Sequence, residues 1–283
     1  MDKVSAEIIK TLNNATVLKT YPESGQKSVF LLSTSDYPKV ILKIIKEMNE
    51  RVKREIDIVN DNDIMGVPKI FSLDSLTVDG TEYHYLLEEY ISGNNLKEVL
   101  LKEGTLAVNT VLCLLDYLLQ IVVQLEELGI VHRDIKPENI IVDDERNFHL
   151  IDFGIARNLN LSSLTMTSAG IGPHTPGYGA PELFQYNKPI INSKADLFSV
   201  GVVAYECLFG EHPFITGKES NLVEVWYKTA TVTPKNYSIE GDQDGQLIGF
   251  IQTLMQKQPS RRPPSATKAL EWFHVAAKTI IKE

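Results

Sequence analysis

The stretch that decides the fold is HRDIKPEN, at His132–Asn139. Further along the chain follow DFG, at Asp152–Gly154, and APE, at Ala180–Glu182. Taken singly, each polar residue in these blocks is best explained as a solvated loop position, because short motifs often occur by chance. Three blocks in a fixed order, with a lysine at a matching place upstream, leave very little room for chance, so we interpret them together.

The upstream lysine is Lys43, which follows the apolar residues Val40–Leu42. A lysine inside an otherwise apolar strand is costly to bury unless it has a partner. The simpler interpretation is a surface lysine on an edge strand. The apolar residues on both sides of Lys43 argue against that interpretation and predict a buried, paired ammonium.

The bulk composition predicts a globular protein with more than one lobe. The chain has 283 residues, of which 43% are apolar and 23% are charged, which suits two lobes or two modest domains. Its net charge of -9 argues against nonspecific binding to nucleic acid or anionic membranes, since both need a basic face. Cys113 and Cys207 lie in apolar runs, so we expect buried thiols in a reducing, cytoplasmic setting and no disulfide.

The first part of the chain has the pattern of a β-rich lobe. Short β-rich runs alternate with turns, which are expected at Ser33–Pro38 and at Asp79-Gly80. Charged residues with apolar positions at helical spacing predict one amphipathic helix over Glu47–Asn60. The predicted strands are Ser28–Ser33, Lys39–Ile45, Lys69–Leu76 and Tyr83–Ile91.

After Ser92-Gly93 the pattern becomes helical, so a boundary is expected near residues 91–94. Helices are predicted over Leu96–Lys102 and Val108–Leu128. The apolar stretches Val111–Val123 and Leu197–Phe209 are too short and too polar for a membrane span and are expected to be buried helices. The crevice between a small β-rich lobe and a larger helical lobe is the default ligand site.

The three blocks and Lys43 resemble the eukaryotic-type (Hanks-type) protein serine/threonine kinase family, in that family's order and approximate spacing, from about Leu18 to Pro263. Among its members, the compact domain is more like the bacterial ones. The resemblance implies an α+β, bilobal protein kinase fold. Residues 1–91 would form a small β-rich N-lobe with one main helix, and residues 92–283 a larger, mostly α-helical C-lobe.

The resemblance assigns the chemistry to four polar residues. Phosphoryl transfer depends on positioning and on neutralising charge. Asp134 would accept the proton of the attacking hydroxyl, and Lys136 would balance the charge on the transferring phosphoryl group. Asn139 and Asp152 offer the oxygen ligands that magnesium prefers, with manganese as an alternative.

In this family the strand lysine pairs with a glutamate on the following helix, which fixes the lysine against the α- and β-phosphates of ATP. Glu55 is the best candidate partner for Lys43, with Glu50 and Asp57 as alternatives. Two further residues would serve architecture: Glu182 would pair with Arg262, and Asp196 would hold the backbone of the catalytic loop.

The glycine-rich loop departs from the family pattern GxGxxGxV. Counting back from Val29, the glycine positions fall on Pro22, Ser24 and Lys27, and Gly25 is the one glycine in this loop. Glycines matter there because backbone amides must approach the phosphates closely. Lys27 would either contact phosphate directly or be exposed, and the sequence leaves both interpretations open.

The adenine pocket is expected to be an apolar sandwich of Val29, Ile41 and Ile141. Ile41 stands where the family has a small alanine, which would tighten the roof of the pocket.

The hinge reads Glu88–Ile91. The backbone of Glu89 and Ile91 would hydrogen-bond the base. Glu88 then falls at the back of the pocket, where an apolar residue or threonine is more usual, and an acidic group there needs a partner or an altered pKa.

The segment from Asp152 to Glu182 resembles the activation segment of the family. Thr165 and Thr167 are the preferred phosphorylation candidates, and a phosphate there would pair with Arg133 and order the loop. The alternative is that these hydroxyls belong to a flexible polar loop. Thr175 resembles the threonine that contacts the catalytic aspartate and lysine in serine/threonine kinases.

The function that the resemblance implies is transfer of the γ-phosphoryl group of ATP to serine or threonine of a protein substrate, together with autophosphorylation. The alternative is a pseudokinase acting as a nucleotide-binding scaffold, supported by the poor glycine loop and opposed by the complete catalytic set. A small-molecule kinase ranks last, because such enzymes typically lack the APE block. No nucleic acid or membrane partner is expected, and the sequence leaves the oligomeric state open.

Overall fold

The computed structural model describes residues 2–21, 27–45, 50–62, 64–153, 157–158, 176–184 and 190–280. The chain divides into two compact units, Met1–Ser92 and Gly93–Glu283. The elements of the first unit are α1 (Lys3–Thr11), β1 (Thr16–Thr20), β2 (Lys27–Ser33), β3 (Val40–Ile45), α2 (Glu50–Asp61), β4 (Ile70–Val78) and β5 (Thr81–Glu89).

The first unit is built on an antiparallel five-stranded sheet with the order β1-β2-β3-β5-β4. The predicted turn at Asp79-Gly80 is confirmed, and it joins β4 to β5 through the pair Val78 and Thr81. Both turn residues have positive φ, 51° and 80°. Two-residue hairpins need this conformation so that the turn matches the twist of the strands, and Asp-Gly adopts it at low cost.

One face of this sheet is covered by α1, a helix that the sequence analysis did not predict. Ile8 and Ile9 of α1 join a buried cluster with alternating strand residues such as Leu32, Leu42 and Leu87. The Asp2 side chain caps the helix by accepting from the Ser5 amide. The described residues of the first unit therefore form two helices where one main helix was expected.

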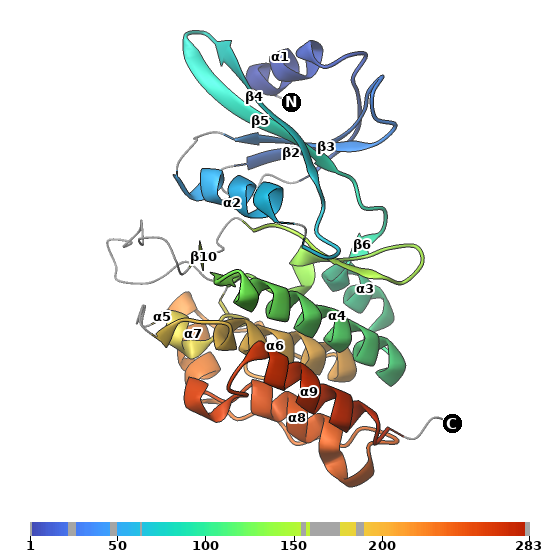
Figure 1. Cartoon of the computed structure of the whole chain (residues 1–283), viewed down its shortest axis with the longest axis vertical. Helices are drawn as coiled ribbons and strands as arrows, with labels where there is room; N and C mark the ends of the chain where they lie inside the picture. Colours follow the sequence, from blue (N-terminus) through green and yellow to red (C-terminus); the bar gives the residue numbers. More distant parts are fainter. Residues whose placement is uncertain are drawn as a thin grey trace. The chain divides into compact units, whose positions relative to one another are not determined.

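The opposite face of the sheet packs against α2. Ile56 of α2 contacts Ile45 and Leu86, which alternate with the residues facing α1. Figure 1 shows α1 and α2 on opposite sides of the strands. Because side chains alternate along a strand, residues 41, 43 and 45 of β3 share the α2 face.

The second unit is mostly helical, so the predicted α+β class with β-rich and helical parts is confirmed. Its main elements are β6 (Asn94–Asn95), α3 (Leu96–Glu103), α4 (Val108–Glu127), β7 (Ile130–Val131), η1 (Pro137–Asn139), β8 (Ile140–Val142), β9 (Phe148–Leu150), β10 (Arg157–Asn158), α5 (Pro181–Phe184), α6 (Lys194–Phe209), α7 (Leu222–Thr231), η3 (Gln243–Gly245), α8 (Gln246–Leu254), η4 (Pro259–Arg261) and α9 (Ala266–Ala277).

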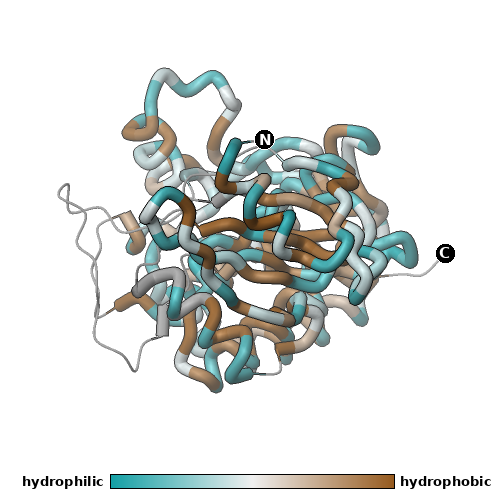
Figure 2. Tube along the Cα trace, turned by 90° about the horizontal axis from the view of Figure 1, so that it is seen from above, coloured by the Kyte–Doolittle hydropathy of each residue, from teal (hydrophilic) through white to brown (hydrophobic). Residues whose placement is uncertain are grey.

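The two predicted buried helices, α4 and α6, form the core of this unit. The buried residues of α6 run without interruption from Ala195 to Cys207, so this helix is enclosed on all sides. Within the described part of the chain, α4 alone is long and apolar enough to cross a membrane. It packs against α6 and α9, which accounts for its apolar face. Figure 2 colours the chain by hydropathy, and brown segments recur along the helices and strands.

A short hairpin of β8 and β9 carries the residues that follow HRDIKPEN. Strand β6 pairs with β8, and β8 pairs with β9. Gly93, directly before β6, has φ of +132°, and a Cβ at this position would lie 2.0 Å from the Val142 carbonyl oxygen. Glycine is therefore required where the chain enters the second unit.

Candidate active site

The site residues of the first unit lie on the α2 face of the sheet. Val29 on β2 pairs with Lys43 on β3, and Ile41 pairs with Glu88 on β5. Cross-strand partners lie on the same face, so the four side chains form one group. Val29 and Ile41 are half-buried, and Lys43 is buried. The sheet thus places two of the predicted adenine contacts beside the predicted phosphate-binding lysine.

Lys43 is paired with an acid, as its burial requires, and one such acid is Glu88. The Lys43 ammonium lies 2.7 Å from Glu88 Oε2, and the two side chains are 10% and 13% exposed. The predicted partner Glu55 lies in α2, and its side chain is outside the described part of the chain. Glu55 stays a prediction, and Glu88 is a partner that was not predicted. Strand alternation across β3 and β5 was the signal that would have found it.

The predicted hinge begins at the end of β5. The Glu89 amide donates to the Lys69 carbonyl at 2.8 Å, so this amide is already used within the protein. Ile91 follows the strand and is half-buried. In the second unit, Ile141 lies on β8 opposite His149 and is also half-buried. These three assignments stay predictions.

Helix α6 holds the backbone of the catalytic loop in the second unit. Asp196 is fully buried, and its two carboxylate oxygens accept the backbone amides of His132 and Arg133 at 2.8 Å each. This role was predicted from the resemblance and is confirmed. Burial raises the pKa of the Asp196 carboxyl to about 6. Arg133 has a φ of +67°, a conformation that costs energy and that the two amide contacts help to hold.

Within this loop, Asp134 is the centre of a small polar network. The Lys136 ammonium lies 3.0 and 3.1 Å from the two Asp134 oxygens. The Asn139 amide donates to Asp134 Oδ2 at 2.9 Å and to the Asp134 backbone oxygen at 3.0 Å. The Asp134 carboxylate is therefore fixed in direction by a cation and an amide, and the residue is buried.

The backbone segments that carry the two predicted metal ligands meet at the base of the β8–β9 hairpin. The Ile151 amide donates to the Asn139 carbonyl at 2.9 Å, and Asp152 is the next residue. Because the Asn139 amide nitrogen is used by Asp134, its side-chain oxygen is the atom available to a cation. One amide oxygen and one carboxylate are hard ligands that fit magnesium with water completing the shell. Among the described residues, no group of three or more His, Cys, Asp or Glu side chains could hold a metal.

Phe153 anchors the segment that carries Asp152. Its ring is buried and meets the His132 ring edge-on at 4.5 Å between centroids. Burial lowers the pKa of His132 to about 4, so this imidazole is neutral at pH 7. Its Nδ1 accepts from the Asp134 amide at 3.2 Å. The aromatic contact therefore ties the DFG block to the catalytic loop.

The APE block is anchored by a buried ion pair. Arg262 lies 2.6 and 2.9 Å from the two carboxylate oxygens of Glu182, and the side chains are 0% and 2% exposed. This predicted pair is confirmed. Just before it, the Tyr178 hydroxyl donates to Glu206 at 2.5 Å, and Glu206 also accepts from Lys97 at 2.8 Å. These contacts hold residues 176–184 against α6.

Gly25, Thr165, Thr167 and Thr175 lie outside the described residues. Lys27 is described as the first residue of β2, and its side chain is not.

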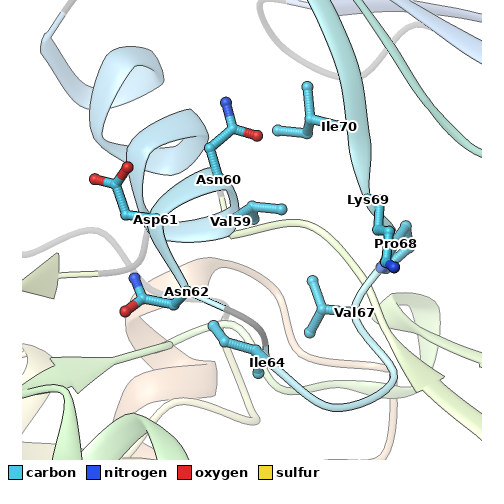
Figure 3. A pocket seen from close by; sticks show the side chains of 9 residues that line it. All are labelled: Val59, Asn60, Asp61, Asn62, Ile64, Val67, Pro68, Lys69 and Ile70. Atoms are coloured by element: carbon cyan, nitrogen blue, oxygen red, sulfur yellow. The ribbon is translucent and has the colours of Figure 1, made fainter.

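A separate cavity lies within the first unit, between the end of α2 and the start of β4 (Figure 3). Its volume is about 430 Å³, and none of the predicted nucleotide contacts lines it. The residues that line it are Val59, Asn60, Asp61, Asn62, Ile64, Val67, Pro68, Lys69 and Ile70. Ile70, which lines the cavity, pairs with Glu88 across the strands, so the cavity borders the face that carries Lys43 and Glu88.

Comparison with known proteins gives a consistent result. The model of the family described as "Protein kinase domain" matches residues 29–273. The chain is 32% identical over 195 residues to "Probable serine/threonine-protein kinase pknA2" of Bifidobacterium longum, covering 69% of this chain and 25% of that protein. It is 27% identical to "Serine/threonine-protein kinase cds1" of Schizosaccharomyces pombe, covering 96% and 59%.

A plant relative, "CBL-interacting protein kinase 11" of Oryza sativa, is 28% identical over 90% of this chain and 48% of its own length. The chain thus spans less than two thirds of each of these relatives. The family model covers most of the chain, and the catalytic loop, the DFG segment and the APE anchor have the contacts described above. The chain therefore belongs to the protein kinase domain family.

Proposed function

We propose that the chain is an ATP-dependent protein serine/threonine kinase. The observation that carries the proposal is the network in which Lys136 and Asn139 fix the Asp134 carboxylate, on a backbone held by the buried Asp196. Family membership and the serine/threonine kinase names of the bacterial and yeast relatives add support.

In the proposed reaction, the serine or threonine oxygen of the substrate attacks the γ-phosphorus of ATP, and the bond to the β-phosphate oxygen breaks. Asp134 accepts the hydroxyl proton, and the Lys136 ammonium balances charge on the transferring group. Asn139 and Asp152 would hold Mg²⁺, or Mn²⁺, which when bound neutralises phosphate charge. Lys43 would contact the α- and β-phosphates.

The base would lie against Val29, Ile41 and Ile141, with the Glu89 carbonyl and the Ile91 backbone as its polar contacts. Gly25 and Lys27 are proposed phosphate contacts, and Glu55 a further partner of Lys43. Thr175 would contact the catalytic residues. We propose that the acceptor is a protein and that the reaction takes place in the cytoplasm, where ATP is available. A net charge of -9 disfavours nucleic acid as a partner.

The test is phosphorylation of a generic basic protein by the full chain, with Mg²⁺ and radiolabelled ATP. Asp134→Asn should lower turnover by roughly 10²–10⁴-fold, the usual size of a general-base effect, without unfolding the protein. The matched control is Asp144→Asn, an exposed carboxylate in the β8–β9 turn, which should leave turnover unchanged. Wild-type turnover in Asp134→Asn, or a wild type that transfers no phosphate, would overturn the proposal. No observation on the described residues favours the scaffold alternative.

Autophosphorylation is part of the same proposal. After incubation with ATP and Mg²⁺, mass spectrometry should find phosphate at Thr165 or Thr167. An unmodified segment in an otherwise active protein would remove this part of the proposal and leave the catalytic roles in place.

A further inference from the structure

The ion pair between Lys43 and Glu88 is buried at a position where this family was expected to carry an apolar residue or threonine. The ammonium and Glu88 Oε2 are 2.7 Å apart, and the side chains are 10% and 13% exposed. A charge taken out of water without a partner is strongly destabilised. Glu88 therefore supplies Lys43 with a compensating charge that neither an apolar residue nor threonine could provide.

The sheet itself sets the geometry of this pair. Strand β3 lies between β2 and β5, and β5 lies between β3 and β4, so both strands are bonded on two sides. Lys43 is opposite Val29 and Leu86, while Glu88 is opposite Ile41 and Ile70. Inner strands move little relative to each other, so the carboxylate holds the ammonium from a rigid support.

This contact is compatible with phosphate binding. A lysine ammonium has three N–H donors, and the Glu88 contact uses one of them. An ammonium can contact several acceptors at once, so the contact with Glu88 is compatible with contacts to phosphate oxygens. The side chains of the pair are only 10% and 13% exposed, so solvent weakens the attraction between the two charges little.

We propose that Glu88 is a positioning residue that aims the Lys43 ammonium at the phosphates of ATP and so contributes to nucleotide affinity through Lys43. The proposal rests on the proposed kinase function of the same site. Glu88 affects binding of the phosphates through Lys43, and it does not recognise the base directly.

The test compares two ligands of the full chain, Mg·ATP and adenosine, by calorimetry. Glu88→Gln keeps the shape and removes the charge, and it should weaken Mg·ATP binding about 10- to 100-fold, the usual effect of a charged hydrogen bond. Adenosine has no phosphate, so its affinity should change less than about threefold. The matched control is Glu82→Gln, an exposed glutamate on the same strand that bonds Ser75, and it should bind both ligands normally.

A double-mutant cycle shows whether Glu88 acts through the lysine. If it does, adding Glu88→Gln to Lys43→Met should weaken Mg·ATP binding no further, because coupled residues are not additive. If the losses of Mg·ATP affinity in the two single variants multiply in the double variant, that result would overturn the proposal. So would unchanged or tighter Mg·ATP binding in Glu88→Gln, or an equal loss for adenosine, which would indicate base recognition or a distorted pocket.

Two further outcomes distinguish a failure of this proposal from a failure of the proposed function. Binding that follows the pattern above in a chain that transfers no phosphate would overturn the proposed function and support the role of Glu88. A wild type that binds no Mg·ATP would overturn both. If Glu88→Gln does not fold, Glu88→Asp replaces it: the charge stays and the shorter side chain breaks the 2.7 Å contact. Mg·ATP affinity should then fall about three- to tenfold, and unchanged affinity would overturn the proposal.

Discussion

Replacing Arg262 by lysine keeps the positive charge and removes the planar set of donors that the second unit uses. All five N–H groups of the Arg262 guanidinium are within hydrogen-bond distance of an acceptor. Two contact the Glu182 carboxylate at 2.6 and 2.9 Å. The others contact the carbonyls of Gln256, Lys194 and Lys257 at 2.7, 2.8 and 3.3 Å. The side chain is 0% exposed, so water cannot replace a lost partner.

The magnitude follows from this set of contacts. A lysine has three donors, so at least two of the five contacts of Arg262 are lost. A charge-assisted bond contributes about 1.5–3 kcal/mol and a carbonyl contact about 0.5–1.5 kcal/mol. Arg262→Lys should therefore lower the free energy of unfolding by about 2–4 kcal/mol. Arg262→Met should cost about 3–5 kcal/mol, because it leaves the Glu182 carboxylate buried without its partner.

The assay is urea unfolding followed by tryptophan fluorescence. Both tryptophans, Trp226 and Trp272, belong to the second unit, so the signal reports the unit that contains Arg262. Arg261→Lys is the control, because this neighbouring arginine is exposed and should change stability by less than about 0.5 kcal/mol. If Arg262→Lys is as stable as that control, the reasoning that ties stability to the five donors is wrong.

Three other perturbations follow from the structure. Gly93→Ala should destabilise the protein by more than about 1 kcal/mol, because its φ is +132° and a Cβ would meet the Val142 carbonyl; Gly249→Ala, in open space within α8, should be neutral or stabilising by urea unfolding. Ile8→Ala should lower the free energy of unfolding by about 2–5 kcal/mol, because Ile8 is fully buried in the sheet cluster. Amide hydrogen exchange in β3 should become faster in this variant and stay unchanged in the control Lys10→Ala, where the replaced side chain is exposed. Equal exchange rates in the two variants would mean that α1 adds nothing to the core. Burial lowers the pKa of Lys257 to about 7, so the unfolded chain binds more protons than the folded chain between about pH 7 and pH 10. The stability of the wild type relative to Lys257→Met should therefore rise with pH across this window. Parallel curves of stability against pH for the two proteins would contradict this prediction.

The sequence predicted strands β2 to β5 and helices α2, α3, α4 and α6 because each of these elements is encoded locally. Short β-rich runs bounded by turns placed the strands β2 and β3 within a residue or two, and Asp79-Gly80 marked its hairpin through its own backbone preference. The helix α1 was missed because its pattern is short, and the apolar face becomes recognisable only against the sheet that it covers.

The anchors of the site were predicted by resemblance and not by the residues themselves. The contacts of Asp196 reach residues more than sixty positions away, and the Glu182–Arg262 pair spans 80 positions. The local sequence of either segment does not indicate which distant residue it will contact. For Lys43, resemblance led to Glu55, and the contact with Glu88 went unnoticed.

By itself, the sequence determined which residue types its motifs contain: a carboxylate, an ammonium and two side chains with oxygen ligands, which are the groups that the proposed phosphoryl transfer needs. Only the tertiary structure decided which buried charges meet. The partner of a buried charge depends on the register between strands, as for Lys43 and Glu88, or on the packing of distant segments, as for Arg262 and Glu182. The physical reason is that a charge removed from water pairs with whichever opposite charge the packed backbone brings within a few ångströms.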